Sequence, residues 1–145
     1  MRRSRRRVIE AVAVASVLGG VPSTVIALVR ARGNVGRAFA DVLASTRAIG
    51  VLVPPGRPGV ARGAVAHGVV SVLMGELLAR TLPRRPSPVR AAAAGLLMGV
   101  LNVGLIGRRF PSIQALPLLP QLADNVTFAV VLTAVADRGI DSARG

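Results

Sequence analysis

Two ionisable side chains lie inside long apolar stretches of this sequence, where charge is rare. His67 falls within residues 60–82, and Asp124 lies in the apolar run that ends at Ala136. Ionisable groups in a bilayer are costly and usually face the interior of a helix bundle. An imidazole and a carboxylate in such a site can relay protons, or hold a cation or a polar solute.

Uncharged polar residues are expected in the same layer. In a bundle of alternating helices, the start of the second, the end of the third and the start of the fourth lie toward one membrane face. The sequence therefore predicts a candidate intramembrane polar site made of His67, Ser71, Asn102, Gln121, Asp124 and Asn125. The structural alternative is that these side chains bond one another, or backbone freed by Pro22 and Pro117, and only fix the helix register.

Several residue types are missing, and their absence excludes whole chemistries. The chain has no Cys and no Tyr, and its 19 basic residues are all Arg, so thiolate, phenol and lysine chemistry are impossible. Ser71 follows His67 by one helical turn, but no nucleophile elbow or glycine-rich oxyanion loop accompanies them. One His and one Asp are too few for a transition-metal site. We expect no enzyme activity, no cofactor and no metal.

Spanning helices must position the polar residues. The chain has 145 residues, of which 52% are hydrophobic, and about 20 residues at 1.5 Å each cross a bilayer core. The expected fold is all-α, a single domain built as a transmembrane four-helix bundle. Its spans are expected at about residues 8–29, 60–82, 89–106 and 116–136.

Prolines predict irregularities in two of these helices. Pro22 lacks an N–H and follows two glycines, so we expect a kink or break near residues 19–23. Three prolines between residues 110 and 120 leave the start of the fourth helix open between Ile113 and Pro120.

Residues 35–50 differ from the spans in their pattern. Apolar residues recur there at helical spacing between polar ones, which predicts an amphipathic helix lying in the membrane interface. Arg37 and Asp41 are spaced to form a surface ion pair on it.

The net charge of +13 is concentrated between the spans. The basic tail, residues 1–7, precedes the first span, and further arginines fill the link after the second, where they interact with lipid headgroups and not with nucleic acid. This predicts a multi-pass protein of a bacterial cell (inner) membrane, a plasma membrane, with a cytoplasmic N-terminus. Residues 4–9 also resemble a twin-arginine export signal, although the downstream chain is itself membrane-like. Glu10 and Glu76 are expected to pair with Arg7 and Arg80 at that membrane face.

Small residues predict where helices approach closely. Ala91, Gly95 and Gly99 form one row on the third helix, and Gly68 and Gly75 belong to a row on the second. Such rows let helix backbones come together in membranes. We expect these two rows to meet.

Four segments carry a resemblance to known proteins. They are residues 19–24 (GGVPST), 67–77 (HGVVSVLMGEL), 107–117 (GRRFPSIQALP) and 121–128 (QLADNVTF). Together they resemble a group of small bacterial, actinobacterial-like, integral membrane proteins. The resemblance implies the architecture, but it implies no activity, ligand or catalytic residue.

Two functions from different classes are compatible with these features. The first is a structural or accessory membrane component that associates with copies of itself or with a membrane-protein partner. The alternative is a small transporter or a proton- or cation-conducting subunit that uses the layer around His67 and Asp124. Convergence of the polar residues on one site would favour the alternative.

Overall fold

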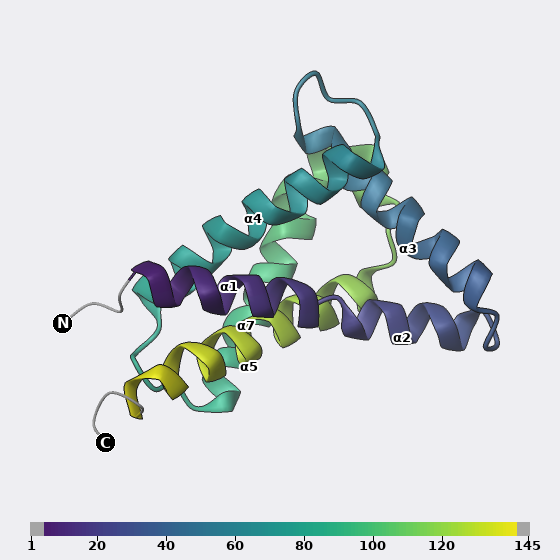
Figure 1. The fold of residues 1–145 in the computed structure, drawn as a ribbon. Helices are drawn as coiled ribbons and strands as arrows, with labels where there is room; N and C mark the ends of the chain where they lie inside the picture. The colour runs from purple at the N-terminus through teal and green to yellow at the C-terminus, as the bar shows by residue number, and fades with distance from the viewer. Residues whose placement is uncertain (1–4, 142–145) are drawn as a thin grey trace.

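The fold is made of helices and turns throughout the described part of the chain. The computed structural model describes residues 5–141, with side chains described to residue 137, so the expected basic tail is described only from Arg5. The elements are α1 (Arg5–Leu18), α2 (Val21–Arg30), α3 (Val35–Ile49), η1 (Gly50–Leu52), α4 (Val60–Thr81), α5 (Pro88–Leu101), η2 (Asn102–Ile106), η3 (Gly107–Arg109), α6 (Pro111–Gln114) and α7 (Leu118–Asp141) (Figure 1).

Four helical stretches are long and apolar enough to cross a membrane. They are α1 with α2, α4, α5 continued through η2 and η3, and α7 to Asp137. The predicted all-α fold with four such helices is confirmed, and the chain is a multi-pass membrane protein. The fourth helix begins at Leu118, which places Pro120 in its first turn, where the missing N–H of proline has no helical partner to lose.

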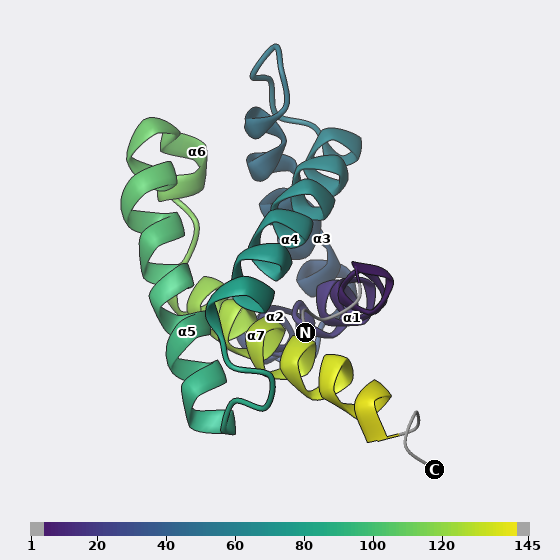
Figure 2. The same ribbon diagram turned by 90° about the vertical axis from the view of Figure 1, so that its left-hand side faces the viewer.

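The helices are more splayed than in an up-down bundle. The α1–α2 stretch and α7 lie side by side and run in opposite directions (Figure 1). The α4 and α5 helices rise steeply away from this pair (Figure 2). Helix α3 closes the wide end by joining the end of α2 to the start of α4, so that the α1–α2 stretch, α3 and α4 outline a triangle (Figure 1).

The apolar core lies at the narrow end, where α1, α4, α5 and α7 meet. Its buried members include Ala11 and Ala15 of α1, Leu78 of α4, Met98 of α5 and Leu132 of α7. Small side chains let α1 and α7 approach closely. Many large apolar side chains, such as those of the outward-facing valines and leucines, are instead exposed on the outside, as expected for a surface that faces lipid.

The glycine rows do not pair as expected. A Cβ added to Gly95 would lie 2.5 Å from the carbonyl oxygen of Asn125, and one on Gly99 would lie 2.9 Å from Leu122, so both glycines face α7. Gly75 faces Val12 of α1. The predicted contact between the α4 and α5 rows is therefore wrong, because α5 packs along α7 instead of along α4.

Gly68 does not have the packing role within this chain that the sequence predicted for it. It lies on an exposed part of α4, and nothing lies within 4 Å of a Cβ built on it. Gly68 and Gly75 are seven residues apart and so lie on nearly one face of α4, but α1 crosses that face only at Gly75.

Helix α3 begins at a capped N-terminus and packs along α4. The Asn34 side chain accepts a hydrogen bond from the Arg37 backbone N–H at 2.9 Å, which satisfies one of the free N–H groups of a helix start. A Cβ on Gly63 of α4 would overlap the Thr46 carbonyl oxygen of α3, so the two backbones are in contact there. The predicted helix is thus present, and its place in the membrane interface remains a prediction.

The charged pairs follow the expected pattern in part. Glu76 and Arg80 form the predicted ion pair at 3.1 Å. Glu10 pairs with Arg6 at 2.8 Å, one full turn away, whereas the sequence predicted a pair with Arg7. Among the described residues Arg37 and Asp41 form no ion pair; Asp41 instead lines the cavity described below.

Candidate functional site

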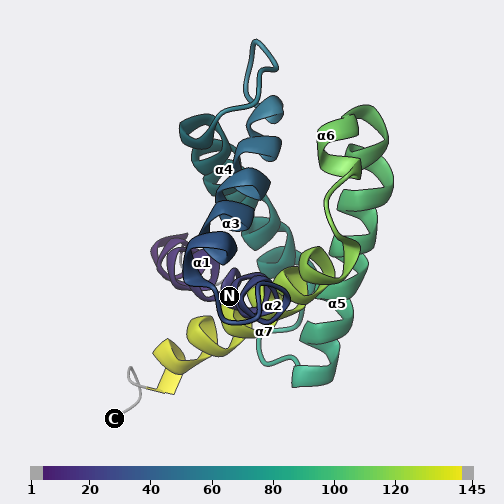
Figure 3. The ribbon, with the colours of Figure 1, turned by 90° about the vertical axis from the view of Figure 1, so that its right-hand side faces the viewer.

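A cavity of about 940 Å³ occupies the wide end of the molecule. The α2 and α7 helices border it on one side, α3 and α4 on a second, and η2 with the α6 region on a third (Figure 3). The predicted polar residues all line this cavity, namely His67, Ser71, Asn102, Gln121, Asp124 and Asn125. The splay of the helices therefore brings them to one place from three separate elements.

The first span is broken beside this cavity. Helix α1 ends at Leu18 and α2 begins at Val21 with Gly20 as its N-terminal cap residue. The predicted break near residues 19–23 is confirmed. Gly19 lies against α7, since a Cβ built on it would be 3.2 Å from the Cβ of Phe128. A larger residue would push the break away from α7.

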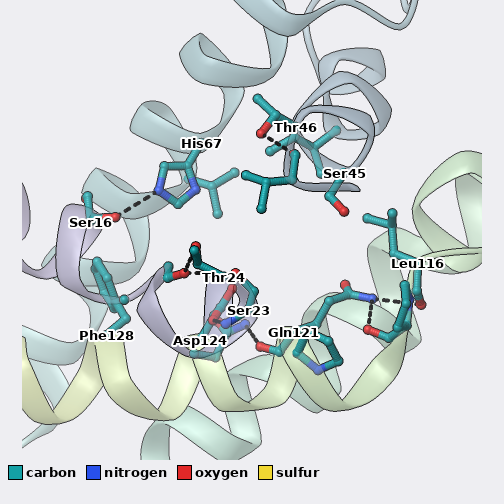
Figure 4. Close-up of a pocket in the computed structure, with 18 of the residues that line it drawn as sticks. Ser16, Ser23, Thr24, Ser45, Thr46, His67, Leu116, Gln121, Asp124 and Phe128 are labelled. Carbon is teal, nitrogen blue, oxygen red and sulfur yellow. Dashed lines mark hydrogen bonds between the residues drawn. The ribbon is translucent and has the colours of Figure 1, made fainter. Parts of the chain in front are cut away.

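His67 satisfies a carbonyl on the α1 side of the break. Its Nε2 lies 3.3 Å from the carbonyl oxygen of Ser16, in the last turn of α1. A carbonyl only accepts hydrogen bonds, so Nε2 carries the proton and donates. Helix ends leave such carbonyls without a partner in their own helix, and α4 supplies that partner through His67 (Figure 4).

Asp124 satisfies the α2 side of the same break. Its Oδ1 accepts a hydrogen bond from the Ser23 backbone N–H at 2.9 Å. This N–H is one of those left free at a helix start, where a carboxylate also meets the positive end of the helix dipole. The carboxylate of α7 is therefore a capping group contributed by a residue 101 positions away in sequence.

The predicted pairing of His67 with Asp124 takes an indirect form. Neither a hydrogen bond nor an ion pair joins them in the described part of the chain. His67 reaches the break from α4 and Asp124 reaches it from α7 (Figure 4). They hold opposite sides of one broken helix, at the edge of the cavity that both line.

The amide side chains form a chain of hydrogen bonds along α7. Gln121 donates to the carbonyls of Leu116 at 3.2 Å and Pro117 at 3.3 Å, and both of these residues lie just before the start of α7. Asn125 donates to the Gln121 carbonyl at 2.8 Å. Asn102 donates to Asn125 Oδ1 at 3.4 Å and so ties η2 to α7.

Asn102 opens a π-helical segment that the sequence analysis did not predict. The segment η2 follows α5 directly, and its wider turn changes the direction in which the following side chains point. Single π turns occur often at functional sites. The short third apolar stretch and Gly104 are the only signals in the sequence, and they are too common to identify a π turn.

Other residues of the cavity were missed as site residues. Arg30 at the end of α2 and Asp41 of α3 both line it, with the hydroxyls of Ser45 and Thr46. The amphipathic pattern of residues 35–50 contained a signal, because Asp41 and Ser45 lie one turn apart on one side of the helix. The sequence analysis instead assigned Asp41 to a surface ion pair with Arg37. Ser71, which was predicted, is buried at 6% exposure where it lines the cavity.

The site offers ionisable side chains, amide oxygens and hydroxyl oxygens around a mostly apolar space. In the part of the chain that the structure describes, no group of three or more His, Cys, Asp or Glu residues is placed to hold a metal ion. Comparison with known proteins finds no protein-family model, no curated protein and no solved structure that matches this chain.

Proposed function

We propose that this protein is a small transporter or a proton- or cation-conducting membrane protein that uses the cavity beside the broken first span. The observation that carries the proposal is the position of His67 and Asp124, which line one cavity together with the other predicted polar residues. Broken helices at a polar cavity are a recurring design of transporter binding sites, because helix ends present free backbone groups to the solute.

The hydrogen bonds at the break link the occupancy of the cavity to the conformation of the first span. His67 and Asp124 each hold one side of the break and each line the cavity. A proton or solute that engages these side chains competes with the Ser16 carbonyl and the Ser23 N–H. Loading of the site therefore changes the bonds that hold α1 and α2 in line, which is the coupling that transport requires.

Proton flux into proteoliposomes tests this proposal. With a potassium gradient, valinomycin and a trapped pH-sensitive dye, the wild-type protein is expected to acidify the vesicles. His67→Ala and Asp124→Asn are expected to lower the rate to that of empty vesicles, because each removes an ionisable group from the cavity. Glu76→Gln is the matched control, since Glu76 pairs with Arg80 on α4 and does not line the cavity. Wild-type flux no greater than that of empty vesicles would exclude proton conduction.

We also propose a bacterial inner membrane location with a cytoplasmic N-terminus. The resemblance to small bacterial membrane proteins supports the location. The start of α1, the α4–α5 link and the last turns of α7 lie at one end of the molecule (Figure 1). This end carries Arg5, Arg6 and Arg7 at the start of α1 and Arg84 and Arg85 in the link, and basic residues favour the cytoplasmic side.

Cysteine labelling in intact cells tests the orientation. The natural chain has no Cys, so a single introduced thiol reports its own side of the membrane. A membrane-impermeant maleimide is expected to label Pro58→Cys, in the α3–α4 link, from outside. Ser87→Cys, in the α4–α5 link, should react only after permeabilisation. The reverse result would invert the proposed topology.

A structural or accessory role is the second candidate function. It is favoured by the use of the cavity amides inside the chain, where Gln121, Asn125 and Asn102 tie α7 to neighbouring elements. Gly68 also leaves an open spot on the exposed side of α4, where another helix, from a second copy or from a partner, has room to approach. A folded protein without flux in the proteoliposome experiment would favour this role.

A further inference from the structure

The hydroxyl groups around the cavity use their hydrogens within their own helices. Five of the six that line the cavity donate to a backbone carbonyl at 2.7–3.0 Å, namely Ser16, Ser23, Thr24, Ser45 and Thr46. A hydroxyl has one hydrogen but two lone pairs. Toward the cavity, these groups therefore have only acceptor capacity left.

The side-chain amides are oriented so that they, too, leave acceptors free. Both Nε2 hydrogens of Gln121 are used, since that nitrogen contacts the carbonyls of Leu116 and Pro117. These partners are acceptors, so the nitrogen must face them and Gln121 Oε1 remains without a donor. Asn125 is oriented by the Gln121 carbonyl in the same way, and Asn102 donates to its oxygen, which leaves Asn102 Oδ1 as a further acceptor.

The ionisable groups add further hydrogen-bond acceptors to the cavity. Asp124 uses Oδ1 for the Ser23 N–H, and the two oxygens of a carboxylate can accept about four hydrogen bonds, so acceptor capacity is left for a ligand. His67 donates through Nε2, so Nδ1 of the neutral ring is an acceptor. Arg30 and Asp41 also line the cavity, and their opposite charges offset each other.

Few donors remain to set against these acceptors. Among the side chains, they are the Ser71 hydroxyl, the second amide hydrogens of Asn102 and Asn125, and the Arg30 guanidinium. The rest of the lining is largely apolar, with Val21, Val25, Val42, Ile106 and Phe128 among it. A ligand that complements this site has N–H groups on a positive head and an apolar body, and about 940 Å³ is ample for one the size of a drug molecule.

We propose that the cavity binds amphipathic organic cations, namely ammonium ions that carry N–H groups on an apolar skeleton. This inference rests on the proposed transport function and gives its substrate class. The ammonium lies toward Asp124 Oδ2 and Gln121 Oε1, on one helix face of α7, and the skeleton lies among the apolar side chains. Cation and proton then compete for one carboxylate, which is the basis for exchanging one for the other.

Fluorescence anisotropy with naphthyl probes tests the ligand class directly. The chain has no Trp and no Tyr, so naphthalene emission is read against almost no protein background. The probes are 2-naphthylmethylammonium, the neutral 2-naphthylmethanol and the anionic 2-naphthylacetate, titrated with full-length protein in a neutral maltoside detergent. Empty micelles give the contribution of probe partitioning.

The ammonium probe is expected to bind about tenfold or more tightly than the alcohol, because a charge-assisted hydrogen bond is stronger than a neutral one. The acetate should bind most weakly. Asp124→Asn removes the charge but keeps an oxygen for the Ser23 N–H, so it is expected to lower ammonium affinity about tenfold and leave alcohol binding unchanged. Glu76→Gln, outside the cavity, should leave all affinities unchanged.

Two results would overturn the inference. They are equal binding of the ammonium and the alcohol, and tightest binding of the acetate. Proton flux without ammonium selectivity would remove this ligand class and leave conduction in place. Selective, Asp124-dependent ammonium binding without flux would keep the site and remove transport.

Discussion

Replacing Gly63 by alanine is expected to lower the stability of the protein by about 3 kcal/mol, at the upper end of the usual cost of overpacking. Gly63 is buried in α4, where an added Cβ would overlap the carbonyl oxygen of Thr46 in α3. A backbone oxygen cannot rotate away as a side chain does. Helix α3 must therefore move off α4, and the cavity side chains on α3 move with it.

Gly68→Ala is the matched control for this prediction. It makes the same chemical change five residues along the same helix, but nothing lies within 4 Å of the new Cβ. Alanine is a better helix former than glycine by up to about 1 kcal/mol, so Gly68→Ala should be neutral or slightly stabilising. In thermal denaturation followed by circular dichroism in detergent, we expect Gly63→Ala to lower the midpoint by about 10 °C. Equal midpoints for the two variants would show that α3 does not pack against α4 at Gly63.

The second large effect is expected at the cap of the broken helix. Asp124→Leu fills a similar volume but leaves the Ser23 N–H without an acceptor, at a cost of about 2–3 kcal/mol. Asp124→Asn keeps an oxygen in the same place and is expected to cost less than about 1 kcal/mol. The difference between the two variants isolates the hydrogen bond from the charge.

Denaturation of both variants in mixed detergent micelles measures this difference. If the Leu variant is as stable as the Asn variant, Asp124 does not hold the break and its hydrogen bond to Ser23 has no structural weight. A stable Asn variant has a further use, because loss of flux or of ammonium binding in that variant then reports the missing charge and not a loss of fold.

The general architecture follows from patterns along the chain. Hydropathy and length predicted the spanning helices, and the proline after two glycines predicted the break between Leu18 and Val21. The sequence also predicts the depth of the polar residues, because a helix rises by about 1.5 Å per residue. His67, Asn102 and Asp124 are therefore predicted to lie in one layer of the membrane.

The partners of these residues were not predictable in the same way. The glycine rows indicated that backbones approach one another, but a small residue accepts any neighbour, and the neighbour of Gly95 and Gly99 is α7 instead of α4. The π turn at Asn102 and the cavity position of Asp41 depend on how whole helices pack. The helix propensities of single residues predict neither feature.

The polar side chains His67 and Asp124 show where this boundary lies. Sequence alone determined that both are ionisable groups within apolar helices, and it predicted that they lie at similar depth beside a break in the first span. Only the tertiary structure decided that His67 meets the Ser16 carbonyl and Asp124 the Ser23 N–H, around a cavity that both line. The physical reason is that depth depends on the rise along one helix, whereas a hydrogen bond depends on the rotation and crossing of two, which packing of the whole chain sets.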